Sequence, residues 1–415
     1  MNSGLDGGAK DGVALPLALA LILVLGLLAA SVFEMLYSER MESLRQARRV
    51  QSELSAESGL SYALYRFASE NEPWRTSELR HFAVDSAVAF RVSSVQDGPF
   101  ANVISENIGK DSGLVRIVAR VGSYPDTLPA LVLLDPEASL LLAGSAKIEG
   151  DVALKKGSVG YSTHYKMPAS KDASFAGKAL TMTDAFWGGI SFHSDLTRDE
   201  FQNLPETDRC VFDGRDTLPS LLECSEVVIR GDAFCRNCEI RSRQLSVSER
   251  ASLNEVKVFA DTASLSGDAS ISGTIFSRDT LYVDLKKEQT NEIRLFVQGR
   301  KTGDASYNGR LEVQRLKSEF ATLAFFGDNW DATMPGISVY ISEDCNIRGA
   351  LFVHGVVDIR GKFRGHALIW NFAFEESGTR WNGFFKDGSI ALDTASRELI
   401  PDIFHFGGTF GYEKE

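Results

Sequence analysis

The stretch VALPLALALILVLGLLAASVF (Val13–Phe33) contains no charged residue over 21 positions. A helix rises about 1.5 Å per residue, so this stretch reaches roughly 30 Å, which matches the hydrocarbon core of a bilayer. It is apolar on every side, whereas a surface helix of a soluble domain has a polar side. We predict a membrane-spanning helix over 13–33.

The apolar stretch continues into a charged segment, with no Gly or Pro between Gly26 and Gly59 to end a helix. One side of this segment is mostly apolar at three- and four-residue spacing, formed by Leu44, Ala47, Val50, Leu54, Glu57, Leu60, Leu64 and Phe67. We predict that the helix continues to about residue 70. Its apolar side is expected to pack against the protein's own sheet, against neighbouring subunits, or against both.

Three runs typical of strands follow, at 88–95, 100–106 and 114–121. In the last run Val115, Ile117 and Ala119 alternate with polar or charged residues, which is the period of a strand with one buried side. Together with the helix they predict an α+β region over 34–129 with a small antiparallel meander.

Beyond residue 129 the sequence is all-β in character. Short alternating apolar runs are separated by single glycines, as in SLSGDASISGTIF (264–276) and NIRGALFVHGVVDIRGKFRGHALIW (346–370). A parallel β-helix needs an inward apolar residue in each strand and a small residue at each corner. We predict a β-solenoid over 130–390 and a C-terminal cap or tail over 391–415. A β-sandwich is the alternative, since it shares short strands and turns.

Charge and cysteine content exclude some classes of function. The formal net charge is −12, which argues against nucleic acid as a partner. Five cysteines are too few for a disulfide scaffold. Cys235 and Cys238 form a CxxC motif, and Cys210 and Cys224 lie upstream. Structural disulfides Cys210–Cys224 and Cys235–Cys238, a four-cysteine zinc site, a redox CxxC and free thiols all remain open.

No catalytic motif occurs: the sequence has no GxSxG elbow, no phosphate-binding Gly-rich loop and no HExxH. A glycosidase needs two carboxylates on one exposed face, and the candidates in the solenoid are Asp268, Asp279, Asp284 and Asp358. We predict a protein that is not an enzyme and has no catalytic residue, no metal site and no cofactor. Late aromatic residues such as Phe372, Phe374 and Phe385 are expected to cap the open end of the solenoid.

The N-terminal region resembles type IV pilins and the pseudopilins of type II secretion. The residues that carry the resemblance are the short polar leader 1–12 ending in Gly12, the opening Gly-Val-Ala-Leu, and AESGLSYALYRF (56–67). It is closest to PilX-like minor pilins and K-type pseudopilins, because Leu17 stands where major pilins carry a Glu. The resemblance implies cleavage by a prepilin peptidase between Gly12 and Val13.

The resemblance also implies a minor pilin or pseudopilin-like structural component of a type IV pilus or type II secretion-type machine, with a role in assembly or adhesion. Expected partners are the membrane, other pilin-like subunits or assembly-platform proteins, and a surface polysaccharide. The expected location is a bacterial inner membrane crossed once, with the body periplasmic or extracellular. The alternative function is an anchored β-helix protein that binds or cleaves carbohydrate.

The orientation and processing of the N-terminus have alternatives. Arginines lie just after the apolar stretch, at Arg40, Arg45, Arg48 and Arg49, and the positive-inside rule alone would keep the body in the cytoplasm. Cleavage after Ser31 would release the body, and an uncleaved helix would be a simple anchor.

Overall fold

A computed structural model of the chain describes residues 14–70, 78–81, 89–97, 100–108, 115–124, 129–163, 170, 172–181, 201, 204–302, 306–327, 336–393, 400–401 and 409–414. The chain divides into two compact units. The first contains residues 1–66, 75–93 and 103–118, and the second contains 67–74, 94–102 and 119–415. The expected leader 1–12 and its processing residues Gly12 and Val13 lie outside the described residues.

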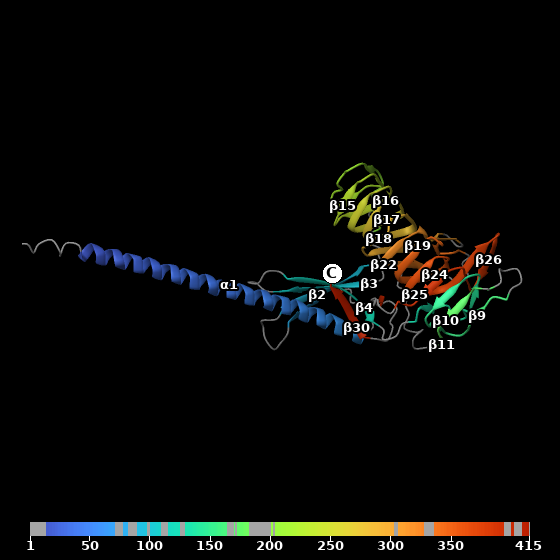
Figure 1. Cartoon of the computed structure of the whole chain (residues 1–415), viewed down its shortest axis with the longest axis horizontal. Helices are drawn as coiled ribbons and strands as arrows, with labels where there is room; N and C mark the ends of the chain where they lie inside the picture. Colours follow the sequence, from blue (N-terminus) through green and yellow to red (C-terminus); the bar gives the residue numbers. More distant parts are fainter. Residues whose placement is uncertain are drawn as a thin grey trace, which may run out of the picture. The chain divides into compact units, whose positions relative to one another are not determined.

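One helix, α1 (Ala14–Glu70), runs for 57 residues without a break (Figure 1). Leu, Ala, Glu and Arg dominate its sequence, and these residues favour a helix. Pro16 stands in the first turn, where its missing N–H removes no intrahelical hydrogen bond. The predicted long, apolar N-terminal helix is therefore confirmed.

A sheet of short strands follows the helix, in the order β1-β2-β3-β4-β29, with β30 also paired to β4. Its strands are β1 (Glu78–His81), β2 (Ala89–Asp97), β3 (Phe100–Asn107), β4 (Arg116–Tyr124), β29 (Ile400–Pro401) and β30 (Thr409–Lys414). β1 is antiparallel to β2, and β29 and β30 are antiparallel to β4. Part of the segment 391–415, expected as a solenoid cap or tail, therefore joins the sheet at β4 instead.

Residues 129–393 of the second unit form a mostly-β region, which we call the β body. This confirms the predicted β-rich region after the helix. Its first strands are β5 (Leu131–Leu133), β6 (Leu140–Ala143), β7 (Lys147–Glu149), β8 (Val152–Leu154), β9 (Val159–Tyr161), β10 (Ser174–Ala176), β11 (Ala179–Thr181), β12 (Arg209–Phe212), β13 (Leu221–Glu223), β14 (Glu226–Ile229), β15 (Phe234–Arg236) and β16 (Glu239–Val247).

Longer strands make up most of the second half of the β body. They are β17 (Ser252–Gly267), β18 (Ser270–Leu285), β19 (Ile293–Thr302), β20 (Ser306–Asn308), β21 (Arg310–Arg315), β22 (Lys317–Gly327), β23 (Val339–Ile341), β24 (Asn346–Ile359), β25 (Lys362–Glu376), β26 (Thr379–Asn382), β27 (Phe384–Lys386) and β28 (Ser389–Ala391). Two hairpins, β19–β20 and β25–β26, are antiparallel, and the other pairings described in the β body are parallel.

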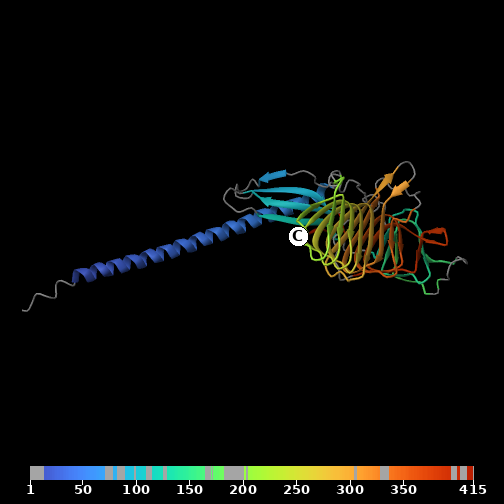
Figure 2. The ribbon, with the colours of Figure 1, turned by 90° about the horizontal axis from the view of Figure 1, so that it is seen from above.

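The parallel pairing repeats at a steady interval. Glu239 pairs with Lys257 and Gln244 with Thr262, each 18 residues further along the chain. One repeat, which we call a rung, contributes a strand segment to each of three faces. In one rung the first face is 234–236, the second 239–242 and the third 244–247. Figure 2 shows these rungs stacked along the β body.

Alternation along each strand builds the core between the three faces. On the second face Ile240, Val258, Ile275 and Leu295 stand in register on successive rungs, and all four are fully buried. Stacking equivalent apolar side chains in this way removes them from water at every rung, which stabilises the stack by the hydrophobic effect.

Glycine is required at one corner of the stack. Gly349 and Gly365 are in register and have φ values of +145° and +137°. A Cβ on Gly365 would overlap the carbonyl oxygen of Gly349, and a Cβ on Gly349 would overlap that of Ala321. Only a residue without a side chain lets the backbones approach this closely.

The first rungs of the β body stack on its last rung. β25 pairs in parallel with β24 and also with β5, through Leu368 and Val132. β28 likewise pairs with both β25 and β7. One rung therefore takes its first and third faces from 384–391 and its second face from 131–133. In Figure 2 the green strands lie beyond the orange and red ones for this reason.

The chain consequently enters and leaves the β body at one place. Ala130 and Leu392 both lie against Gly150, where an added Cβ would come within 2.8 Å and 2.9 Å of their Cβ atoms. Tyr124 of β4 and Thr409 of β30 are register partners. The β body is thus an insertion between two neighbouring antiparallel strands.

Candidate functional site

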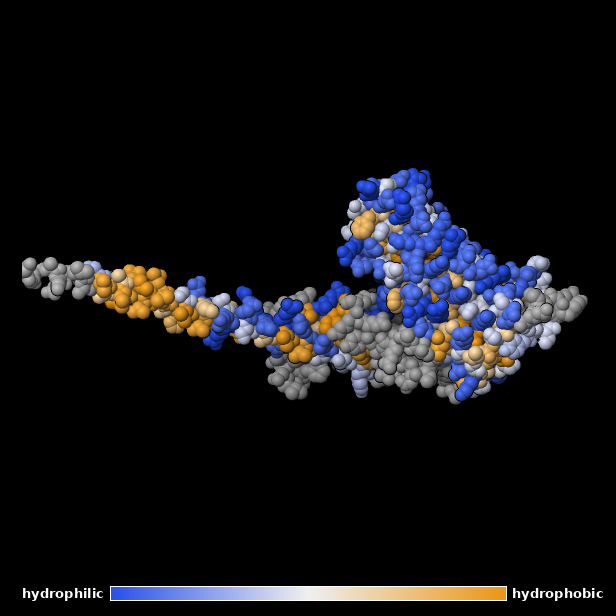
Figure 3. Space-filling view, in the orientation of Figure 1, coloured by the Kyte–Doolittle hydropathy of each residue, from blue (hydrophilic) through white to orange (hydrophobic). Residues whose placement is uncertain are grey.

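The first half of α1 presents apolar side chains on all sides. Its large apolar residues from Leu15 to Tyr37 are 55–73% exposed. Figure 3 shows this part of the helix as a continuous hydrophobic surface. Within the described part of the chain, α1 is the one helix long and apolar enough, by length and composition, to cross a membrane. A membrane anchor and a signal sequence both have these properties.

The second half of α1 packs closely on the sheet of the first unit. Its buried side is formed by Ser52, Ser55, Ala56, Gly59, Leu60 and Ala63. A Cβ on Gly59 would overlap Ser105 Oγ and come within 2.9 Å of the Phe90 ring. Small side chains thus bring the helix backbone close to the strands.

The predicted apolar side of this half was wrong in detail. Leu44, Val50 and Leu54 were expected to pack, but they are 45%, 49% and 57% exposed. The side with the smallest residues is buried instead, because close approach of backbone to sheet excludes large side chains there. The exposed leucines and valine extend the apolar surface of α1 beyond residue 37.

The cysteines pair as two disulfides, Cys210–Cys224 and Cys235–Cys238. Their Cα atoms are 6.1 Å and 6.2 Å apart, within the range of ordinary disulfides. With all four thiols engaged, neither a four-cysteine zinc site nor a redox CxxC dithiol is present in this state. The described residues contain no group of three or more His, Cys, Asp or Glu placed to hold a metal ion.

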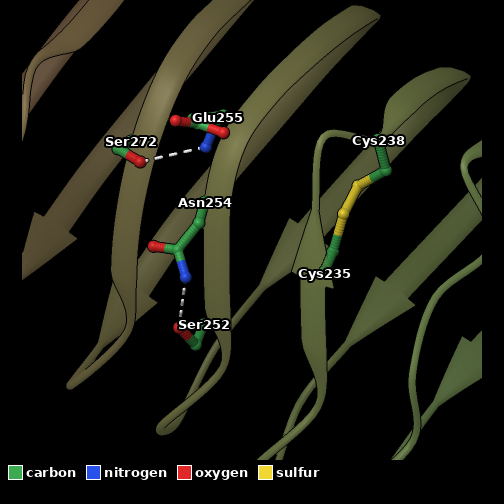
Figure 4. Close-up of a disulfide and its surroundings, with 6 residues drawn as sticks. All are labelled: Cys235, Cys238, Ser252, Asn254, Glu255 and Ser272. Atoms are coloured by element: carbon green, nitrogen blue, oxygen red, sulfur yellow. Dashed lines mark hydrogen bonds between the residues drawn. A yellow bond between two sulfur atoms is a disulfide. The ribbon is translucent and has the colours of Figure 1, made fainter. Parts of the chain in front are cut away.

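The CxxC disulfide crosses a corner between the first and second faces (Figure 4). Cys235 is fully buried and stands in register with Leu253, which stands in register with Ile271. Asn237, between the two cysteines, has a φ of +53°. On the next rung Glu255 has a φ of +55°, and its N–H donates to Ser272 Oγ over 3.0 Å. The disulfide therefore replaces an apolar contact inside the stack.

Cys345 is the remaining free cysteine. Its side chain is buried, and its thiol donates to the Val313 carbonyl oxygen over 3.4 Å. Burial raises the pKa of Cys345 from 9.0 to about 12, so the thiol is neutral at physiological pH. A buried, neutral thiol is neither a nucleophile nor a metal ligand.

The carboxylates considered for glycosidase chemistry do not converge. Asp284 and Asp358 both belong to the third face, but three rungs separate them, roughly 14 Å at about 4.8 Å per strand. Glycosidase pairs lie closer together than this. Burial raises the pKa of Asp358, against the opposing effect of Arg360 at 3.0 Å. Asp268 stands in an exposed turn between β17 and β18.

Late aromatic residues lie inside the stack and not at an open end. Phe372, Phe374 and Phe385 are buried, and the rings of Phe372 and Phe385 are 4.9 Å apart. The expected cap is therefore wrong for these three residues, because the rungs at 131–181 continue the stack beyond them. Phe404, Phe406 and Trp330 lie outside the described residues.

A row of polar side chains that sequence reasoning missed runs along the outside of the third face. Its members stand in register on successive rungs: Ser246, Ser264, Tyr282, Glu312, Tyr340 and Asp358. They lie 18 to 30 positions apart in the sequence, so the row becomes visible only when the register is known. Burial and then the charges of Asp284 and Glu312 raise the pKa of Tyr282, which keeps its hydroxyl a neutral donor.

Comparison with known proteins gives no assignment: no family model, no curated protein and no solved structure matches the chain.

Proposed function

We propose that this protein is a membrane-anchored structural component of a cell envelope, of the minor pilin or pseudopilin type. The observation that carries the proposal is the division of α1 into two parts. The first part is apolar and exposed on every side, and the second packs on a sheet through small residues. In the proposed mechanism the first part waits in the bilayer and then packs among equivalent helices of other subunits.

We further propose that the β body is a parallel β-helix that serves as the exposed part of the subunit. Three features support this classification: parallel pairing at 18-residue steps, three faces in a rung, and single-glycine corners. A β-sandwich would consist mainly of antiparallel pairs.

The cysteine pairing supports a body outside the cytoplasm. Disulfides persist in oxidising compartments and are rare in the cytosol. Both disulfides lie in the rungs between residues 209 and 238. A periplasmic or extracellular body, with α1 crossing a bacterial inner membrane once, is consistent with that chemistry. It opposes the orientation that Arg40, Arg45, Arg48 and Arg49 would favour.

The test is the N-terminal residue of the mature protein, isolated from the membrane of a bacterium that carries a pilin-type machine. We expect Val13, and we expect a Gly12→Val variant to keep its leader while the matched control Gly8→Val is processed. A mature chain that starts at Met1 would make α1 a simple anchor and reject the pilin-type proposal. A start near Val32 would reject it too, because the body would then be released.

A further inference from the structure

The row on the third face combines aromatic rings with hydrogen-bonding groups. Ser264, Tyr282, Glu312 and Tyr340 are partly exposed and stand on four successive rungs. Thr262 and Thr280 are in register beside the row and also face outwards. Hydroxyl, phenol and carboxylate groups on one flat face are suited to a ligand that is rich in hydroxyls.

The charges of this face are internally neutralised. Arg310 Nε lies 3.1 Å from Glu312, and Arg315 Nε lies 3.4 Å from Asp284. Arg360 pairs with Asp358. Each carboxylate therefore has its own guanidinium, and the face offers no surplus of positive charge to a polyanion. A neutral ligand is the complement of such a surface.

The two tyrosines have a defined spacing. One rung, that of Glu312, separates Tyr282 from Tyr340, so their backbones are about 10 Å apart along the stack, at about 4.8 Å per strand. The guanidinium of Arg360 lies 5.7 Å from the centre of the Tyr340 ring and limits its rotation. Two platforms held at a fixed interval fit a polymer with a matching repeat.

A β-1,4-linked sugar chain has such a repeat. Successive sugars alternate in orientation, so every second sugar presents the same C–H face, and the disaccharide length is close to the tyrosine spacing. A sugar ring stacks its C–H face on an aromatic ring and directs its hydroxyls to the groups around it. The row from Ser246 to Tyr340 spans four intervals, roughly 19 Å, at about 4.8 Å per strand.

We propose that the third face of the β body binds a neutral β-1,4-linked polysaccharide, laid along the row from Ser246 to Tyr340, with Tyr282 and Tyr340 under alternate sugars. Glu312 then lies between the two stacked sugars and accepts hydrogen bonds from hydroxyls of the sugar that bridges them. This site is independent of α1 and of any processing at Gly12.

The test is calorimetric titration of the full chain in lipid nanodiscs with cellohexaose and chitohexaose, since maltoside detergents would themselves supply sugar. We expect saturable binding to at least one of these two neutral probes. Tyr282→Ala and Tyr340→Ala should each weaken it by about tenfold, as expected for a central aromatic anchor. The Phe variants should bind nearly as well as the wild type because the ring remains.

Tyr161→Ala is the matched control, since Tyr161 is 48% exposed on β9 and lies outside the row. It should bind like the wild type. Maltohexaose has α-linkages, and polygalacturonate is anionic, so neither should bind. The proposal is overturned if neither neutral probe binds, if the two Ala variants bind as tightly as Tyr161→Ala, or if maltohexaose binds equally well. Each of these outcomes leaves the mature N-terminus, and so the pilin-type proposal, unaffected.

Discussion

Cys345 shows how strongly the interior of the β body controls a single side chain. The thiol is buried between rungs, and its pKa is raised to about 12 by that burial. We expect the native protein to leave it unmodified by a thiol reagent such as DTNB at pH 8, and the unfolded, unreduced protein to show one reactive thiol per chain. Rapid reaction of the native protein would contradict the buried position.

The same shift gives stability a pH dependence. Above about pH 9 the unfolded chain loses the thiol proton, whereas the folded chain retains it up to about pH 12. The free energy of unfolding should therefore fall through this window, by at most about 1.4 kcal/mol per pH unit from this group. Below pH 9 the contribution is fully present.

Residue-scale prediction from sequence succeeded where chemistry is local. The two cysteine pairs were among the alternatives, because short separations in the chain bring their Cα atoms within reach. The row from Ser246 to Asp358 could not be found, since its members come together only through parallel pairing over many residues. The buried side of α1 was misjudged because the pattern records hydrophobicity and not the close approach that Gly59 permits.

At the scale of elements, the disulfides stabilise the rungs at one end of the stack. Cys210–Cys224 links positions 14 residues apart, and Cys235–Cys238 links positions three apart. We expect the Cys210→Ala/Cys224→Ala pair to lower the free energy of unfolding by about 3 kcal/mol and the Cys235→Ala/Cys238→Ala pair by about 2, because loop-closure entropy grows with loop length. Urea unfolding of the purified full chain measures both.

A reducing agent provides the control for this experiment. Dithiothreitol should destabilise the wild type and leave the variant without all four cysteines unchanged. Equal stability of wild type and both pairs under oxidising conditions would mean that the disulfides contribute nothing to these rungs.

The helix and the succession of short strands could be predicted from their periods, 3.6 and 2 residues. The partners of the strands could not. Nothing local in Leu131–Leu133 indicates that it pairs with Ala367–Ile369, more than 230 positions away. For the same reason the pairing of Thr409–Lys414 with β4 was missed, and the segment was assigned to a tail.

At the scale of the whole molecule, the insertion of the β body between β4 and β30 predicts that it folds alone. Its ends meet at Gly150, beside Ala130 and Leu392. We expect a 129–393 fragment to give a β-rich circular dichroism spectrum and one cooperative thermal transition. A 145–393 fragment lacks β5, which supplies the second face of the shared rung, and should melt at a lower temperature. Equal melting of the two fragments would contradict the shared rung.

The meeting of the first and last rungs has a consequence for how the β body comes apart. A solenoid wound from one terminus to the other has a loose chain end at each extremity, from which strands peel away one rung at a time. Here both extremities, at 174–181 and 209–223, are internal to the chain, and the entry and exit points are sandwiched in the middle of the stack. No rung at either extremity has a free end to fray, so opening one must widen a closed loop against its neighbours, and proteases should meet a body that resists nibbling from its tips.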